Sequence, residues 1–90
     1  MFTIETTNRF EKDVKTCHKR KYNIQLIVDV IERLRKTGTL PLIYKPHKLQ
    51  GNFIGFWEAH IKPDWIIIWD KQDETKTIIL VRTGTHSDLF

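Results

Sequence analysis

The chain has 90 residues, which is the size of one folded domain and excludes a large multidomain enzyme. With 40% hydrophobic and 29% charged residues, four Gly and three Pro, its composition excludes a disordered or low-complexity chain. Fifteen Lys and Arg against eleven Asp and Glu give a net charge of +4, which favours an anionic partner such as nucleic acid or an acidic protein. We therefore expect a single domain over residues 1–90.

The first part of the chain predicts a short strand and a helix. Residues 2–5 alternate as a strand does, and three polar residues that can cap a helix follow: Thr6, Thr7 and Asn8. Three apolar residues share one face of that helix: Phe10, Val14 and Cys17. Three basic residues gather on the opposite face: Lys12, Lys15 and Lys19. The pattern is typical of an amphipathic helix with a basic outer surface.

A second helix should begin after Asn23, which can cap it, and end before Gly38. Its apolar stripe is expected to contain five residues at helical spacing: Ile24, Ile27, Val28, Ile31 and Leu34. Only a short connection separates it from the first helix, so we expect an antiparallel helical hairpin.

The second half of the chain predicts a loop followed by three strands. Pro41, Pro46 and Gly51 interrupt residues 39–51, which we interpret as a loop. The β-rich runs that follow are residues 52–61, 65–70 and 76–83, and their short connections favour antiparallel neighbours. The middle run, WIIIWD, has no clean alternation, as expected for a central strand with apolar surroundings on both faces. The predicted fold class is α+β, with an N-terminal strand, a helical hairpin and then a mainly antiparallel sheet.

Three histidines lie outside the helices: His47 in the loop, His60 near a strand end and His86 in the tail. Histidine can accept or donate a proton near neutral pH, so three of them brought together by the sheet ends would form an acid and base site. Taken singly, each is more often a polar surface residue. Asp64 follows His60 in a tight connection, where it can orient an imidazole or simply cap the turn. Arg82 stands at another segment end.

Two aromatic residues have two possible roles each. Trp65 stands at a strand entrance, where an exposed ring can stack on a base, although aromatic residues in strands mostly belong to the core. Phe90 either anchors the tail or presents its ring beside a site.

The sequence offers little support for a metal or another cofactor. The three histidines and Asp64 can form a zinc-like ligand set, but their spacing is not diagnostic, and no HExxH motif or Cys pair accompanies them. Nucleotide-cradling glycine motifs are absent as well. The single cysteine, Cys17, cannot form an internal disulfide and fits a reducing compartment. Without a signal-peptide pattern or a long apolar run, we expect a cytoplasmic protein that does not enter a membrane.

Three motifs resemble a known family. PHKLQG at residues 46–51, HIKPDW at 60–65 and RTGTHSDLF at 82–90 are similar, in that order, to motifs of the YafQ-type toxins of the RelE superfamily. The similarity covers essentially the whole chain, and the final nine residues are its most specific part. Many relatives have an acid in place of Pro46 and a Cys in place of Ala59, so the position of the loop and the affinity for metals can differ here.

The resemblance implies a type II toxin that cuts mRNA in the ribosomal A site, without a metal, and is neutralised by an antitoxin similar to DinJ. Contact with operator DNA is expected only through the complex with the antitoxin. The resemblance implies His47, His60, Asp64 and His86 as the catalytic set, although the sequence does not decide which is acid and which is base. Substrate contacts are implied for three residues: Trp65, Arg82 and Phe90. The basic helix face at Lys12, Lys15 and Lys19 is then a surface for ribosomal RNA.

Two other functions are compatible with these residues. The chain can be a non-catalytic RNA-binding or operator-binding module on the same fold, although every proposed catalytic position is filled. A metal-dependent hydrolase built on the three histidines is the third candidate.

Overall fold

The computed structural model describes residues 1–90 and contains one five-stranded sheet with the strand order β1-β5-β4-β3-β2. The elements, in chain order, are β1 (Thr3–Thr6), α1 (Asn8–Lys19), α2 (Ile24–Thr37), η1 (Leu42–Tyr44), β2 (His47–Lys48), η2 (Gly51–Phe53), β3 (Trp57–Lys62), β4 (Trp65–Gln72), β5 (Thr77–Gly84) and α3 (His86–Leu89). β1 pairs with β5 in parallel, and all other neighbours are antiparallel. This arrangement confirms the predicted α+β fold class. None of the helices combines the length and the apolar character that a membrane span requires.

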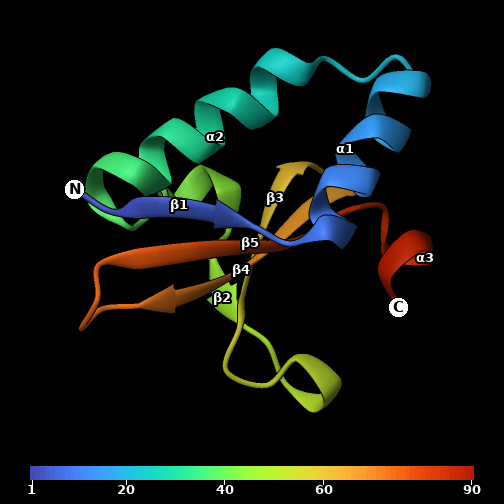
Figure 1. Ribbon diagram of the computed structural model, residues 1–90. Helices are drawn as coiled ribbons and strands as arrows, with labels where there is room; N and C mark the ends of the chain where they lie inside the picture. The colour runs from blue at the N-terminus through green and yellow to red at the C-terminus, as the bar shows by residue number, and fades with distance from the viewer.

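Both long helices begin at the predicted caps. The hydroxyl oxygen of Thr7 accepts a hydrogen bond from the Phe10 backbone N–H, and the Asn23 side chain accepts one from Gln25. α2 ends at Gly38, whose φ of 74° lies in the left-handed region that favours glycine. The two helices cover the same side of the sheet and diverge from the turn that joins them (Figure 1).

One residue of the apolar stripe predicted for α2 is not buried, so this part of the prediction is wrong. Val28 is 48% exposed, while the buried residues of α2 are Ile27, Val30 and Leu34. A helix advances by about 100° per residue, so a stripe centred on residues 27, 30 and 34 turns position 28 toward solvent.

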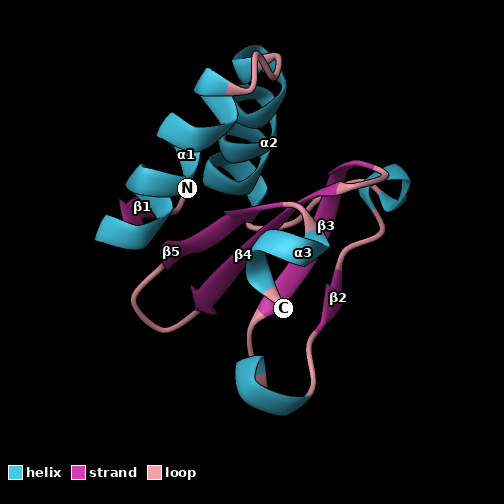
Figure 2. Ribbon diagram, turned by 90° about the vertical axis from the view of Figure 1, so that its right-hand side faces the viewer, coloured by secondary structure: helices cyan, strands magenta, loops and turns pink.

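β4 is apolar on both faces, as predicted for a central strand. Trp65, Ile67 and Trp69 belong to the main core beneath the helices. Ile66 and Ile68 point to the other face, where they pack against Leu89 of α3. Figure 2 shows the two long helices on one side of the strands and the turn between β2 and β3 on the other. The sheet therefore has a second, smaller apolar cluster on the face that the long helices leave open.

The predicted boundaries between residues 39 and 61 are wrong in two respects. The segment interpreted as a loop contains β2, whose His47 pairs with Glu58 of β3. The strand predicted over 52–61 begins only at Trp57, because Gly51 and Gly55 adopt positive φ angles of 70° and 89° that break an extended run. A strand of two residues has no alternation to detect, so the sequence predicts four strands where the sheet has five.

Candidate active site

Four aromatic side chains form a row at the rim of the sheet, on the face opposite the long helices. The ring centroids of His47 and His60 lie 6.5 Å apart, and those of His60 and His86 lie 5.8 Å apart. Phe90 continues the row at 5.9 Å from His86. These residues come from β2, β3 and the two ends of α3, so the fold brings together groups that are distant in the chain. The prediction that the histidines outside the helices meet is confirmed.

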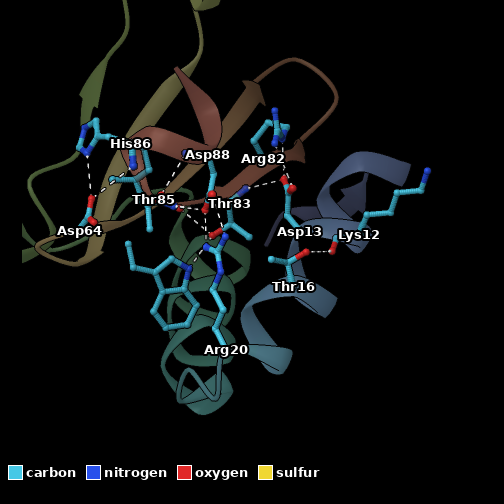
Figure 3. Close-up of polar contacts among 12 residues, drawn as sticks. Lys12, Asp13, Thr16, Arg20, Asp64, Arg82, Thr83, Thr85, His86 and Asp88 are labelled. Atoms are coloured by element: carbon cyan, nitrogen blue, oxygen red, sulfur yellow. Dashed lines mark hydrogen bonds and ion pairs between the residues drawn. The ribbon is translucent and has the colours of Figure 1, made fainter.

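Asp64 occupies the short turn between β3 and β4 and faces His86 (Figure 3). Its Oδ1 atom lies 3.7 Å from Nδ1 of His86 and 3.5 Å from the backbone nitrogen of the same residue. Both side chains are open to solvent, with 74% of Asp64 and 52% of His86 exposed. An exposed carboxylate beside an exposed imidazole can orient the ring and remain accessible to a large substrate.

The ring of His60 is oriented by its own turn. Nδ1 of His60 lies 3.2 Å from the carbonyl oxygen of Pro63, which can only accept a hydrogen bond. The Nδ1 atom therefore carries the proton in the neutral ring, and Nε2 is left with a lone pair that can accept one.

His47 makes a different set of contacts. Its Nδ1 atom donates to the carbonyl oxygen of Lys45 at 2.8 Å, and its Nε2 atom lies 3.1 Å from Oε1 of Glu58. Both ring nitrogens therefore lie beside acceptors of the protein itself. His47 has no unengaged ring nitrogen with which to remove a proton from a substrate.

Glu58 is a site residue that the sequence did not single out. It is only 4% exposed, and the His47 ring is its one ionic partner. Strand alternation puts Glu58 on the same face as His60. An acidic residue two positions before a histidine in a mainly apolar strand is the sequence signal that could have identified Glu58 as a site residue. Its pairing with His47 depended on β2, which was not predicted.

Replacing His47 with alanine should lower the free energy of unfolding by about 1–2 kcal/mol, because the buried Glu58 carboxylate loses its partner. Adding Glu58→Leu to this variant should recover most of the loss, since both polar groups are then removed together. Urea denaturation of the wild type, the single variant and the double variant measures the effect. A single variant as stable as the wild type would show that the pair contributes nothing to the fold.

Trp65 is not an exposed platform, and this correction removes it from the predicted substrate contacts. It is 3% exposed, and its ring packs 4.9 Å from that of Tyr22. Its indole N–H donates to the hydroxyl of Thr83 at 3.0 Å. Alternation along β4 is the reason, because it turns position 65 toward the helices while the preceding Asp64 stays in the turn at the rim.

Arg82 is not a free phosphate ligand either. Its Nε atom lies 2.7 Å from Oδ2 of Asp13 in α1, and the two side chains are only 15% and 12% exposed. The same Asp13 oxygen accepts the backbone N–H of Thr83 at 3.2 Å. Arg82 therefore joins β5 to α1 through two hydrogen bonds from its guanidinium to the Asp13 carboxylate.

The tail, which lacked a predicted place, forms the short helix α3. Thr85 and Asp88 make reciprocal side-chain to backbone hydrogen bonds that close a capping box, and Leu89 is buried. The Arg20 guanidinium, together with the Thr85 backbone N–H, holds the pKa of the Asp88 carboxyl well below its usual range. A lowered carboxyl pKa means that this pairing is complete above the ordinary value of about 3.9 and is lost only as the pH falls toward the lowered one.

The charged groups do not form a metal centre as they are placed. No set of three His, Cys, Asp or Glu side chains converges closely enough to hold a metal ion. Cys17 is buried in the core, and this burial raises the pKa of its thiol, so it is neither a ligand nor a nucleophile at the rim. The basic side chains of α1 that were singled out are all exposed: Lys12, Lys15 and Lys19.

The whole chain resembles bacterial toxins of known structure. A histidine-to-glutamine variant of YafQ from Escherichia coli has a TM-score of 0.92 at 36% identity, covering 100% of this chain and 99% of that one. A metal-bound toxin from Helicobacter pylori has a TM-score of 0.90 at 38% identity, with 100% of both chains covered. YafQ in the E. coli DinJ-YafQ complex has a TM-score of 0.88 at 37% identity, covering 100% of this chain and 99% of that one. The similarity over the whole length of the chain therefore defines a small α+β protein of the bacterial toxin type.

The sequence comparison identifies the family. Residues 2–90 match the family described as bacterial toxin of type II toxin-antitoxin system, YafQ. The mRNA interferase toxin YafQ of E. coli strain K12 is 40% identical over 88 residues, which are 97% of this chain and 94% of that protein. The chain belongs to the YafQ family of type II toxins. The resemblance carried by the three motifs is thus confirmed.

Proposed function

We propose that this toxin is an endoribonuclease that cuts mRNA on the ribosome and is neutralised by a cognate antitoxin. The observation that carries the proposal is the meeting of His60, His86 and Asp64 at one exposed rim. Solvent-exposed groups that transfer protons can reach a macromolecular substrate, whereas a small ligand would need an enclosing pocket. The family relationship to an mRNA interferase toxin supports the same substrate.

The proposed reaction is a transesterification within the RNA chain. The ribose 2′ oxygen attacks the adjacent phosphorus, the bond to the 5′ oxygen of the next nucleotide breaks, and a 2′,3′-cyclic phosphate and a 5′-hydroxyl result. One group takes the 2′ proton and another donates a proton to the departing 5′ oxygen. Each positioned proton transfer contributes typically 10²- to 10⁴-fold in rate.

The contacts of the site suggest which histidine is the general base and which is the general acid. His60 has a free Nε2 lone pair, because Nδ1 faces the Pro63 carbonyl, and this suits it to take the 2′ proton. His86 lies beside the Asp64 carboxylate, which can orient its ring, so His86 is the proposed donor to the leaving oxygen. His47 lies next in the row and is proposed to lie beside the phosphate, with both of its ring nitrogens engaged by Lys45 and Glu58.

Phe90 is the proposed platform for a base. Its side chain is 62% exposed. The Phe53 ring packs against it in an edge-to-face contact, with 5.5 Å between the ring centroids. Stacking of a base on an aromatic side chain contributes about 1–3 kcal/mol.

The exposed lysines of α1 are proposed to contact phosphates of ribosomal RNA. Lys12, Lys15 and Lys19 are among the fifteen basic residues that give the chain its net charge of +4. Binding that depends on such contacts releases counterions, so ribosome affinity should fall by about one power of salt concentration for each phosphate neutralised.

The proposed partner is an antitoxin of the DinJ type, because a relative with the same fold is solved in a complex with DinJ. Operator DNA is then reached through that complex. A positively charged toxin is suited to an acidic antitoxin segment.

The function is tested by comparing the wild type with His60→Ala in a translation extract, while mapping the 5′ ends of the mRNA. The wild type should cut only when ribosomes are present. A chelator that is selective for zinc and other transition metals, and so leaves the magnesium of the ribosomes in place, should have no effect. His60→Ala should cut about 10²- to 10⁴-fold more slowly. Equal growth arrest by both proteins in cells, without cleavage, would instead indicate a non-catalytic binding module. Cleavage that stops with chelator would indicate a metal-dependent hydrolase.

A further inference from the structure

The C-terminal helix α3 carries two groups of the proposed site but is too short to hold itself in place. His86 is its first residue, and Phe90 directly follows its last. Isolated helices shorter than about 12 residues are marginal in water, and α3 has four residues. The orientation of His86 and Phe90 must therefore come from contacts between α3 and the rest of the protein.

The strongest of these contacts is a two-pronged ion pair between Arg20 and Asp88. The two terminal guanidinium nitrogens of Arg20 donate to Oδ2 and Oδ1 of Asp88 at 2.6 and 3.0 Å. Arg20 caps the end of α1, so the pair joins the first helix to the last one across 68 residues of sequence (Figure 3). A fork of this kind fixes direction as well as distance.

The direction matters because of where Asp88 lies on α3. At about 100° per residue, Asp88 is roughly 200° from His86, while Phe90 is within about 40° of it. Holding Asp88 against α1 therefore turns His86 and Phe90 to the opposite side of the turn. On that side His86 meets Asp64, and Phe90 meets Phe53.

The buried side chain of α3 leaves this rotation open. Leu89 is buried against Ile66 and Ile68, which attaches the turn to the sheet at one point. An apolar contact is not directional, so Leu89 alone permits α3 to swivel. Asp88 also belongs to the capping box, which stabilises the turn internally but makes no contact with α1.

We propose that Arg20 is a positioning residue, which sets the orientation of His86 and Phe90 at the scissile phosphate through its ion pair with Asp88. The inference rests on the proposed function, because His86 and Phe90 matter only if this rim cuts RNA. Arg20 itself need not touch the substrate. Its guanidinium is engaged by Asp88, in contrast to the three exposed lysines of the same helix.

The test uses Arg20→Ala, Asp88→Asn, their combination, and Arg33→Ala as a control that removes one exposed arginine from α2. Asparagine at position 88 keeps an oxygen for the Thr85 backbone N–H but loses the charge. Each single change should lower the single-turnover cleavage rate of ribosome-bound mRNA about 10- to 100-fold, with little change in KM. The combined variant should be no slower than the slower single one, and Arg20→Lys should recover part of the rate.

Asp88→Asn separates positioning from direct RNA binding. If Arg20 were simply a phosphate ligand, removing the negative charge at 88 would leave binding and cleavage at least as strong as in the wild type. That result would overturn the proposal, as would additive losses in the combined variant.

A second measurement does not depend on cleavage. In NMR spectra of the free toxin, Arg20→Ala should shift or broaden the His86 imidazole signals and the α3 amide signals, and leave those of His47 unchanged. Arg33→Ala should leave all of them as in the wild type. Unchanged His86 signals in Arg20→Ala would refute the positioning role. If the wild type fails to cleave RNA, the proposed function fails, and the spectra still decide whether Arg20 orients α3.

Discussion

His86→Ala should reduce mRNA cleavage about 10²- to 10⁴-fold, because the variant loses the group proposed to protonate the leaving 5′ oxygen. Its fold should persist, since the His86 side chain is 52% exposed and its loss opens no cavity. Single-turnover cleavage of ribosome-bound mRNA measures the effect, and a thermal melt within a few degrees of the wild type confirms folding. Ser87→Ala, a change at the exposed neighbouring position, serves as the matched control and should cut normally.

The contact between His86 and Asp64 predicts that the effects of changing these two residues depend on each other. If Asp64 acts by orienting the His86 imidazole, Asp64→Ala should slow the wild type considerably and the His86→Ala variant much less. Equal losses in both backgrounds would mean that the two residues act independently. Cleavage by His86→Ala within about threefold of the wild type, a change worth well under 1 kcal/mol, would remove the residue from the mechanism.

Trp65→Ala should lower the free energy of unfolding by about 3–5 kcal/mol, because it empties part of a close-packed core and leaves Thr83 without its indole donor. At roughly 4–8 °C per kcal/mol for a domain of this size, the melting temperature should fall by more than about 12 °C. Trp65→Phe should lose considerably less, since a ring remains in the core. Thermal and urea denaturation measure all three proteins.

Phe90→Ala is the matched comparison for this change. Its ring is 62% exposed, so the variant should melt close to the wild type and still cut RNA more slowly. Loss of toxicity in Trp65→Ala should therefore follow loss of folded protein. Wild-type stability combined with slow cleavage in Trp65→Ala would instead restore the base-stacking role that the sequence suggested.

Two ion pairs explain how a small protein can hold the row of exposed histidines at its rim in place. Asp13 binds Arg82 and the backbone of Thr83, and so joins α1 to the end of β5 just before the tail. Arg20 then binds Asp88 in the tail itself. Both pairs lie outside the row of histidines. The proposed catalytic groups can remain solvent-exposed because other residues hold the elements that carry them.

Much of the fold follows from local patterns. The helix starts at Thr7 and Asn23 and the helix end at Gly38 are properties of a few neighbouring residues, so the sequence predicts them correctly. The apolar run in β4 likewise indicates a strand buried on both faces. β2 escaped prediction because its two residues carry no periodic signal, and its pairing with β3 left the contact between His47 and Glu58 unforeseen as well.

The sequence by itself predicted the α+β fold class and the positive net charge, and its three motifs indicated the YafQ-type toxins. It also singled out the candidate site residues His47, His60, Asp64, Trp65, Arg82, His86 and Phe90. The tertiary structure alone decided which side chains are accessible and what each one binds. It buries Trp65, occupies Arg82 with Asp13 and ties Arg20 to Asp88. Partners that lie 68 or 69 residues apart are not set by any local spacing. They depend on how the sheet and helices pack, because a side chain's burial and its ionic partner are properties of the assembled core.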